Sequence, residues 1–382
     1  MPLADEAQIL RTSWPRRLLS VVAKEPVLVL LLVAFALLQV FHRTSWASLP
    51  RLVDWQTVLT LAGLLILTKA LELSGSLSWL SHRVVHHIHS ERALAALLVT
   101  LAAALSTILT NDVALFVVVP LVLSLNKLTP LPLKRLVIFV ALAVNAGSIL
   151  TPLGNPQNLF LWQVSGVSFG RFVLALAPLC AVSMAMLYVL TMASFKARPL
   201  DLSRDTAVQP VDRAFAGVAA FLFAAFVLLA DSHHAGIGLI GVACGFLIWR
   251  RDAVLKIDWL LLLIFVLMFI VLRSVAALPW VHETIGRAGL DTPLRAYAAG
   301  MLLSQGISNV PAAIMLAEFT KNWRALAFGV SVGGFGVAIG SLANLIAVRL
   351  AKQRGMWLQF HCFSIPFWVV AGALGTWFVS HF

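Results

Sequence analysis

Small polar residues interrupt two otherwise apolar stretches of the sequence. The interrupting residues are Thr110, Asn111 and Asp112 in segment 93–125, and Ser308 and Asn309 in segment 297–319. Where a helix breaks, the N–H groups that open the next half-helix attract an anion, while freed carbonyls and Ser, Thr or Asn oxygens coordinate a hard cation. These residue types therefore predict the binding of an ion or small solute inside apolar surroundings.

Two glycine-containing runs, TPLGNPQNL and AIGSLANLI, carry the other candidate binding residues. These are Thr151, Gly154, Asn155 and Asn158 in the first run, and Gly340, Ser341 and Asn344 in the second. Pro152 and Pro156 interrupt a helix, and glycine permits close approach of backbones. Small residues also serve simply to pack membrane helices. Asparagines at matching places in both runs favour a binding site over packing alone.

These polar landmarks form an internal repeat. Asp54-Trp55 and Lys69 recur as Asp258-Trp259 and Arg273, at an offset of 204 residues. The first polar interruption recurs in the second at an offset of 198, and the two glycine-containing runs are related by an offset of 186. The order is kept while the offset shrinks, as expected if the second copy has shorter loops.

The elements that position these residues are membrane helices. With 60% hydrophobic and only 12% charged residues in 382, the chain has too little polar surface to cover a soluble globule. Crossing a bilayer core takes about 20 apolar residues. The expected spans are 26–41, 55–80, 134–165, 172–192, 214–230, 235–249, 259–278, 324–350 and 362–378. Segments 93–125 and 297–319 are expected to be re-entrant hairpins, and spans 134–165 and 324–350 to be broken helices.

The basic residues support one orientation of these spans. Placing the N-terminus in the cytoplasm puts 19 of the 28 Lys and Arg residues in cytoplasmic segments and seven outside, as the positive-inside rule requires. The net charge of +12 is thereby explained without nucleic acid as a partner. The expected location is the inner (plasma) membrane, with the lipid bilayer as solvent.

The predicted fold is therefore an all-α polytopic membrane protein with inverted repeats, two re-entrant hairpins and two broken transmembrane helices. Its expected parts are an N-terminal segment with the first helix (1–53), repeat 1 (54–195), a cytoplasmic linker (196–213), connecting helices (214–257) and repeat 2 (258–382). The second repeat is inverted only if the short span 235–249 crosses the membrane.

Four motifs in order resemble the ion transporter superfamily, which includes divalent anion:sodium symporters, citrate transporters and arsenite permeases. The motifs are TNDVALFVVVPL, NAGSILTPLGNPQNL, SNVPAAIML and GGFGVAIGSLANLI. The Asn-Asp pair is similar to arsenite permeases, and TPLGNPQNL is similar to the citrate group. The resemblance implies that Thr110-Asn111 and Ser308-Asn309 bind substrate or cation, with sodium at Asn111, Asp112 and Asn309. It also implies homodimers that work by an elevator-like movement.

The sequence thus favours an ion-coupled secondary transporter of a small anion, either a di- or tricarboxylate or an inorganic oxyanion. Asp112 either carries a proton or ligates sodium, or it caps the helix that follows, so both coupling ions stay open. The alternative is a sodium/proton antiporter or an arsenite-type efflux permease. We expect no enzyme activity and no cofactor, because no nucleophile paired with a base and no metal-binding set lies within the spans.

Overall fold

The computed structural model describes residues 26–41, 45–85, 88, 90–200 and 210–381. Within these ranges the chain is helical, with a single isolated antiparallel bridge between Ser90 and Pro199. The all-α prediction is confirmed. The basic residues of segment 1–25, and residues 201–209 of the expected linker 196–213, lie outside the described residues.

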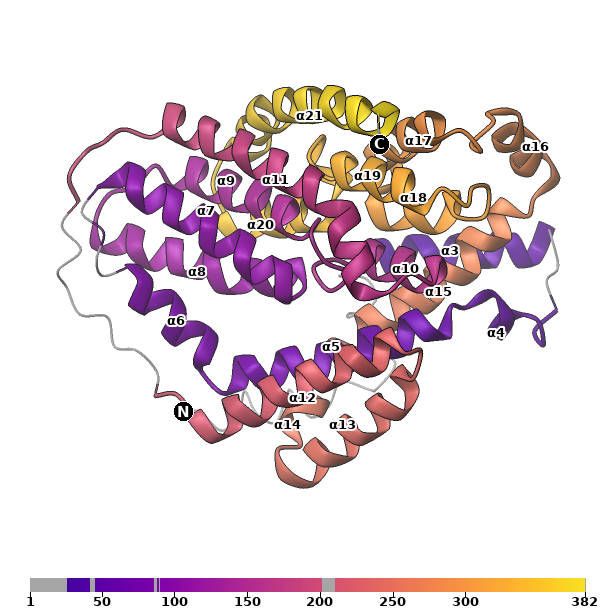
Figure 1. The fold of residues 1–382 in the computed structure, drawn as a ribbon, viewed down its shortest axis with the longest axis horizontal. Coiled ribbons are helices and arrows are strands. Elements are labelled where there is room, and N and C mark those ends of the chain that lie inside the picture. The colour runs from indigo at the N-terminus through magenta and orange to yellow at the C-terminus, as the bar shows by residue number, and fades with distance from the viewer. Residues whose placement is uncertain (1–25, 42–44, 86–87, 89, 201–209, 382) are drawn as a thin grey trace, which may run out of the picture.

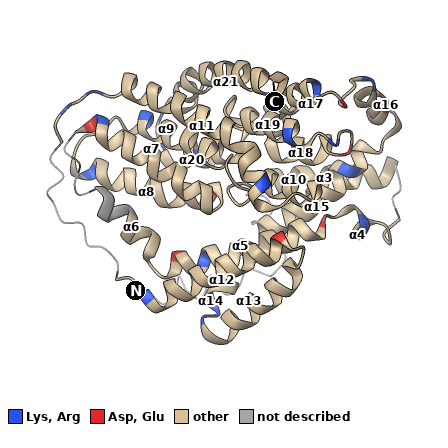
Figure 2. Ribbon diagram, in the orientation of Figure 1, with Lys and Arg blue, Asp and Glu red and all other residues tan. Residues whose placement is uncertain are grey.

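Six helices are long and apolar enough to cross a membrane. They are α5 (Trp55–Leu73), α7 (Glu91–Ile108), α11 (Phe169–Ser194), α12 (Arg213–Asp231), α15 (Trp259–Ala276) and α21 (Met356–His381). Lys, Arg, Asp and Glu gather at helix ends and loops, leaving the helix bodies largely free of charge (Figure 2). Length and composition together confirm a polytopic membrane protein.

Two buried helices form the centre of the larger part of the molecule (Figure 1). In α9 (Leu133–Gly147) every residue from Leu136 onward is buried. It packs against α7, α11, α21, α8 (Asn111–Leu128) and α20 (Leu342–Ala351). The other central helix, α19 (Trp323–Gly333), packs against α11, α21, α10 (Pro156–Ser165), α17 (Pro293–Ile307) and α18 (Asn309–Leu316). All four polar runs noted in the sequence border these two helices.

A second group of helices forms around α5. It comprises α12, α13 (Ala235–Trp249) and the short α14 (Asp252–Leu255), and in the view of Figure 1 it lies below the central helices. The antiparallel neighbours α12 and α13 are joined by three residues, among which His233 has a positive φ of 60°. α13 is 15 residues long, which corresponds to about 22 Å at 1.5 Å per residue.

Helix boundaries follow the predicted segments with a few differences. The expected span 55–80 ends at Leu73, because Gly75 takes a φ of 75° and a new helix, α6 (Ser76–Val85), begins. Helix α15 packs on α3 (Pro26–Phe41) and α4 (Leu49–Leu52). It is followed by α16 (Pro279–Arg287), which the sequence did not predict. The last span is longer than expected, starting at Met356.

Candidate functional site

The four predicted interruptions are all helix breaks. The first tip lies between α7 and α8, where Leu109 and Thr110 are extended, and the second lies between α17 and α18, at Ser308. Residues 148–155 separate α9 from α10. A loop containing the 3-10 helix η1 (Ala338–Gly340) separates α19 from α20. These breaks are called here tip 1, tip 2, loop 1 (148–155) and loop 2 (334–341).

Tip 1 is tied to loop 1 by backbone and side-chain hydrogen bonds. The backbone N–H of Asn111 donates to the Gly154 carbonyl at 2.9 Å. The Thr151 hydroxyl donates to the Thr107 carbonyl at 2.5 Å, and the Thr107 hydroxyl donates to the Gly147 carbonyl at 3.1 Å. The tip and the loop therefore form one rigid polar unit inside the apolar core.

The asparagines of loop 1 hold the loop itself. The Asn158 amide donates to three carbonyls, those of Ser148, Ile149 and Thr151, at 3.1, 3.1 and 3.4 Å. The Asn155 amide donates to the Ser148 carbonyl and hydroxyl, each at 3.0 Å. Its Oδ1 also caps α10 by accepting from the N–H of Asn158. The side-chain amide N–H groups of these two predicted binding residues are thus hydrogen-bonded to loop 1 itself.

Two of these bonds have counterparts in tip 2 and loop 2. The Asn344 amide donates to the Gly334 carbonyl at 2.8 Å, as Asn158 donates to Ser148 186 residues earlier. The Gln305 amide donates to the Gly333 carbonyl at 2.7 Å, as Thr107 donates to Gly147. The equivalent residues of the two loops are 186 positions apart, and Thr107 and Gln305 are 198 positions apart. Two hydrogen bonds of the first half therefore have counterparts at the offset positions of the second half.

The two halves meet at one buried cluster of amide and hydroxyl groups. The Asn145 Nδ2 donates to Asn344 Oδ1 at 2.7 Å, and the Ser341 hydroxyl donates to Asn145 Oδ1 at 2.9 Å. Asn309 of tip 2 borders the same place, because a Cβ on Gly334 would lie 3.1 Å from Asn309 Nδ2 and 3.5 Å from Asn145 Oδ1. This cluster of Asn145, Asn309, Ser341 and Asn344 is called the junction.

Tip 2 has an unusual backbone. Ser308 takes φ 73° and ψ 157°, a region that is essentially reserved for glycine, and it is half-buried. Strained conformations of this kind persist where the surrounding structure enforces them, and they gather at binding sites. Thr110, the equivalent residue of tip 1, has an ordinary φ of −63°. The two tips therefore differ in backbone although Thr110-Asn111 and Ser308-Asn309 are similar in sequence.

Relieving this strain is expected to stabilise the protein. Ser308→Gly should raise the unfolding free energy by about 1 kcal/mol, because glycine enters this region without a Cβ penalty. The matched change at tip 1, Thr110→Gly, should lower it by about 1 kcal/mol, since it only adds chain entropy to the unfolded state. Thermal unfolding of both variants in detergent measures this. A decrease for Ser308→Gly as large as that for Thr110→Gly would contradict the strain.

A cleft of about 450 Å³ opens beside tip 1, between α5, α8, α15 and α20. Thr110 and Asp112 of the tip line it, together with Leu342 at the start of α20. Three cationic and three acidic side chains share its wall: Lys69, Lys256, Arg349, Glu72, Asp112 and Asp258. The cleft thus gives water and charged solutes a path toward the first of the two tips.

Three of these six charged side chains are already in ion pairs. Lys69 pairs with Glu72 at 2.9 Å, and Lys256 pairs with Asp252 of α14 at 2.8 Å. The Lys256 hydrogen bond holds the pKa of the Asp252 carboxyl below its usual range. The Asp258 carboxylate caps α15 by accepting from the N–H of Leu261 at 2.9 Å.

Asp112 differs from these groups. Its carboxyl forms no hydrogen bond or ion pair with another described residue. It is half-buried in the first turn of α8, where the helix dipole favours a negative charge. A partnerless carboxyl at a helix break, in the lining of an open cleft, is suited to take up a cation or a proton.

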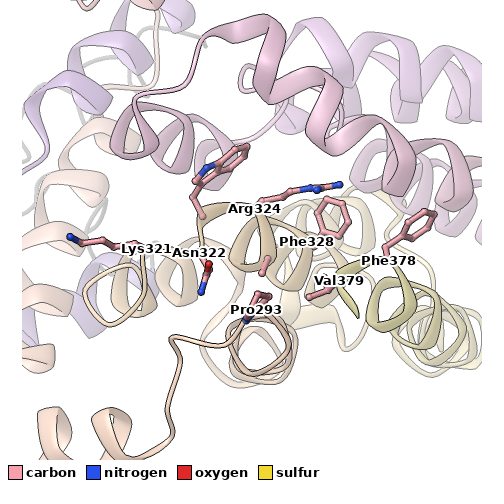
Figure 3. A pocket seen from close by; sticks show the side chains of 9 residues that line it. Pro293, Lys321, Asn322, Arg324, Phe328, Phe378 and Val379 are labelled. Atoms are coloured by element: carbon pink, nitrogen blue, oxygen red, sulfur yellow. The ribbon is translucent and has the colours of Figure 1, made fainter. Parts of the chain in front are cut away.

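A second hollow, of about 260 Å³, lies at the far ends of α17, α19 and α21 (Figure 3). Its polar side chains are Lys321, Asn322 and Arg324, and the Arg324 guanidinium lies 5.4 Å from the Phe328 ring centroid. The lining contains no residue of either tip or loop. We therefore place the candidate site at the junction and the cleft.

Several residues of this site were not predicted from the sequence. Asn145 lies inside the apolar helix α9 and has no asparagine at its repeat position, which is Ser331. Thr107 and Gln305 occupy equivalent positions but differ in type. Applying the offset of 198 residues to the flanks of the tips would have identified this pair, whereas no repeat signal marks Asn145.

Comparison with known proteins gives one family and several relatives. The family model described as "Citrate transporter" matches residues 18–322. "Inner membrane protein YbiR" of Escherichia coli is 41% identical over 335 residues, covering 88% of this chain and 89% of that one. An "uncharacterized transporter" of Methanocaldococcus jannaschii is 32% identical, covering 85% and 87%. A "putative transporter arsB" of Dictyostelium discoideum is 27% identical over 120 residues, covering 31% and 21%.

Proposed function

The chain belongs to the citrate transporter family, and we propose that it is an ion-coupled secondary transporter of a small anion, a di- or tricarboxylate or an inorganic oxyanion. The family and the names of its relatives indicate a membrane transport protein rather than an enzyme. The observation that carries the anion proposal is the junction, where equivalent broken elements of the two halves meet through Asn145 and Asn344.

The junction supports anion binding because its polar groups are neutral donors at helix ends. Four half-helices, α8, α10, α18 and α20, begin at the tips and loops, and the N-terminal end of each carries a partial positive charge of about one half. The side-chain amides of Asn111 and Asn309 add donors without a fixed charge. A small anion is thereby stabilised without the desolvation cost that a buried lysine or arginine would carry.

The cleft supports alternating access. It reaches tip 1 at the end of the molecule where Lys256 and Arg349 lie, which the sequence assigns to the cytoplasm. We propose that the two halves are inverted repeats with α13 crossing the membrane, that the tips form re-entrant hairpins, and that the hairpin-bearing part moves as an elevator within a homodimer. The same proposal places the chain in the inner membrane with a cytoplasmic N-terminus.

The proposed coupling group is Asp112, with sodium held between Asn111, Asp112 and Asn309 or a proton held on the carboxyl. Asp112→Asn keeps the shape but removes the charge, so gradient-driven accumulation should fall to the level reached without a gradient. Exchange of anion across the membrane should continue. Accumulation and exchange in the same vesicles separate the two effects, and Asp252→Asn, outside the cleft wall, is the matched control. Unchanged accumulation would exclude Asp112 from coupling.

The alternative function is sodium/proton antiport or arsenite-type efflux. The partnerless carboxyl of Asp112 favours it, because antiport needs one titrating group and no organic anion site. The likeness of a 120-residue segment to a relative named arsB also supports it. In this case cations exchange without any flux of carboxylate.

Uptake into proteoliposomes tests the proposal. Citrate, succinate, sulfate and arsenite are compared under imposed sodium or proton gradients, with Asn111→Ala and Asn309→Ala beside the unaltered chain. Gradient-dependent uptake of one anion, lost in both variants, is the expected result and identifies the coupling ion. Cation exchange without anion flux would replace this proposal with the antiporter.

A further inference from the structure

The residues that line the open cleft have equivalents in the other repeat, and these equivalents lie in a closed contact between helices. Applying the offsets of 204, 198 and 186 residues to the lining of the cleft gives a second set of positions on α5, α10, α15 and α18. Leu260, Leu261 and Ile264 of α15 correspond to Gln56, Thr57 and Thr60 of α5, and Arg349 of α20 corresponds to Gln163 of α10. We call the second set the seam.

The seam is shut in this structure. α10 packs against α5, and α18 packs against α15, whereas the equivalent pairs, α20 with α15 and α8 with α5, flank the cleft. Thr57 and Thr60 are fully buried and Gln163 is 9% exposed. Phe160 and Phe269, at the positions of cleft residues Ile346 and Leu65, meet edge to face with centroids 5.4 Å apart.

The seam is more polar than a permanent helix contact requires. Three of its buried atoms, Gln56 Nε2, Thr57 Oγ1 and Gln163 Oε1, have no hydrogen-bond partner among the described residues. The Gln163 Nε2 reaches Thr60 Oγ1 only at 3.4 Å. Each unsatisfied buried group costs about 1–3 kcal/mol. The open cleft has leucine and isoleucine at the corresponding positions of α15. Polar side chains at these positions of α5 are therefore not needed for the helix to form.

A salt bridge closes the outer end of the seam. Arg273, which corresponds to Lys69 of the cleft, pairs with Glu318 beyond α18 at 2.8 Å and donates to the Leu52 carbonyl at 2.7 Å. Lys69 instead pairs within its own helix, with Glu72. Arg273 therefore bridges α15, α4 and the base of the second hairpin, while its counterpart leaves the cleft open.

We propose that the seam is the closed half of the solute pathway, and that Gln56, Thr57, Thr60 and Gln163 line a hydrated cleft to tip 2 when it opens. This rests on the proposed transport function. The four side chains then hydrogen-bond to water and to the passing anion, which accounts for the unsatisfied atoms of Gln56, Thr57 and Gln163 in the closed state. Opening separates Phe160 from Phe269 and breaks the Arg273–Glu318 pair.

Thiol labelling tests the seam without knowledge of the substrate. Cys180, Cys244 and Cys362 are first replaced by serine, and Thr60→Cys, its repeat partner Ile264→Cys and the buried α5 control Leu67→Cys are made singly. A membrane-impermeant maleimide is applied to either face of sealed vesicles. Thr60→Cys should react from the face opposite to that which labels Ile264→Cys. The labelling rate of Thr60→Cys should be about ten to a thousand times lower than that of Ile264→Cys, as expected if the seam is open only in a minor state.

A disulfide supplies the second arm. In the Thr60→Cys/Gln163→Cys variant, oxidation should abolish labelling of the seam and stop citrate exchange. Reduction should restore both, which distinguishes a seam held closed by the disulfide from a misfolded protein. Labelling of Thr60→Cys no faster than Leu67→Cys, or from the same face as Ile264→Cys, would overturn the inference. Unhindered exchange by the oxidised pair would also overturn it. Opposite-face labelling without any anion flux would retain the seam and reject the anion proposal.

Discussion

Gly147→Val abolishes transport and removes the folded protein from the membrane: this is the largest effect we expect from any single substitution. A Cβ at Gly147 would lie 2.3 Å from the Ala103 carbonyl oxygen and 2.6 Å from its Cα. Both obstacles are backbone atoms of α7, which cannot rotate away. The two helices must separate, so the cost exceeds the roughly 1–3 kcal/mol of ordinary overpacking. The Thr107–Gly147 hydrogen bond is lost as well.

Size-exclusion chromatography after solubilisation measures the folded fraction, and uptake in vesicles measures function. Gly217→Val is the matched control, because Gly217 lies within a membrane helix and a Cβ there meets nothing within 4 Å. It should elute and transport as the unaltered chain does. A Gly147→Val protein with an unaltered elution profile and transport would show that α7 and α9 are not in close contact.

Much of the architecture could be predicted from the sequence, because a membrane requires long apolar helices and satisfied backbone hydrogen bonds. Long apolar runs predicted helices, and polar residues at 110–112 and 308–309 predicted the breaks between α7 and α8 and between α17 and α18. Backbone at membrane depth must find hydrogen-bond partners, so a polar interruption of an apolar run is informative. The end of α5 at Leu73 was missed, because Gly75 stands in a run that remains apolar on average.

Side-chain roles within the site were less accessible to sequence reasoning. Asn158 and Asn344 occupy equivalent positions, and each amide holds its own loop. Only the Asn344 Oδ1 also reaches across to the other half, because its partner Asn145 has a serine at its repeat position. Nothing in spacing distinguishes these cases. The φ of Ser308 is equally hidden, since serine gives no local signal for a conformation that favours glycine.

The junction gives the second large prediction. Asn344→Ala should lower transport about ten- to a hundredfold. It leaves the Gly334 carbonyl without its donor and the Asn145 amide without its acceptor, and each unsatisfied buried group costs about 1–3 kcal/mol. Initial rates of uptake measure the loss. Asn126→Ala is the control, since it removes one asparagine that accepts from the N–H of Leu131 at the end of α8. It should transport at the unaltered rate.

A double-mutant cycle then decides whether the junction works as one unit. Asn145→Ala alone should lower uptake to a similar extent, because it also removes the acceptor of the Ser341 hydroxyl. If the Asn145–Asn344 contact couples the halves, the double variant should lose little more than either single variant, giving a coupling free energy of about 0.5–3 kcal/mol. Additive losses would mean that each asparagine supports only its own half. The anion would then have to be bound by one tip and loop instead of by both.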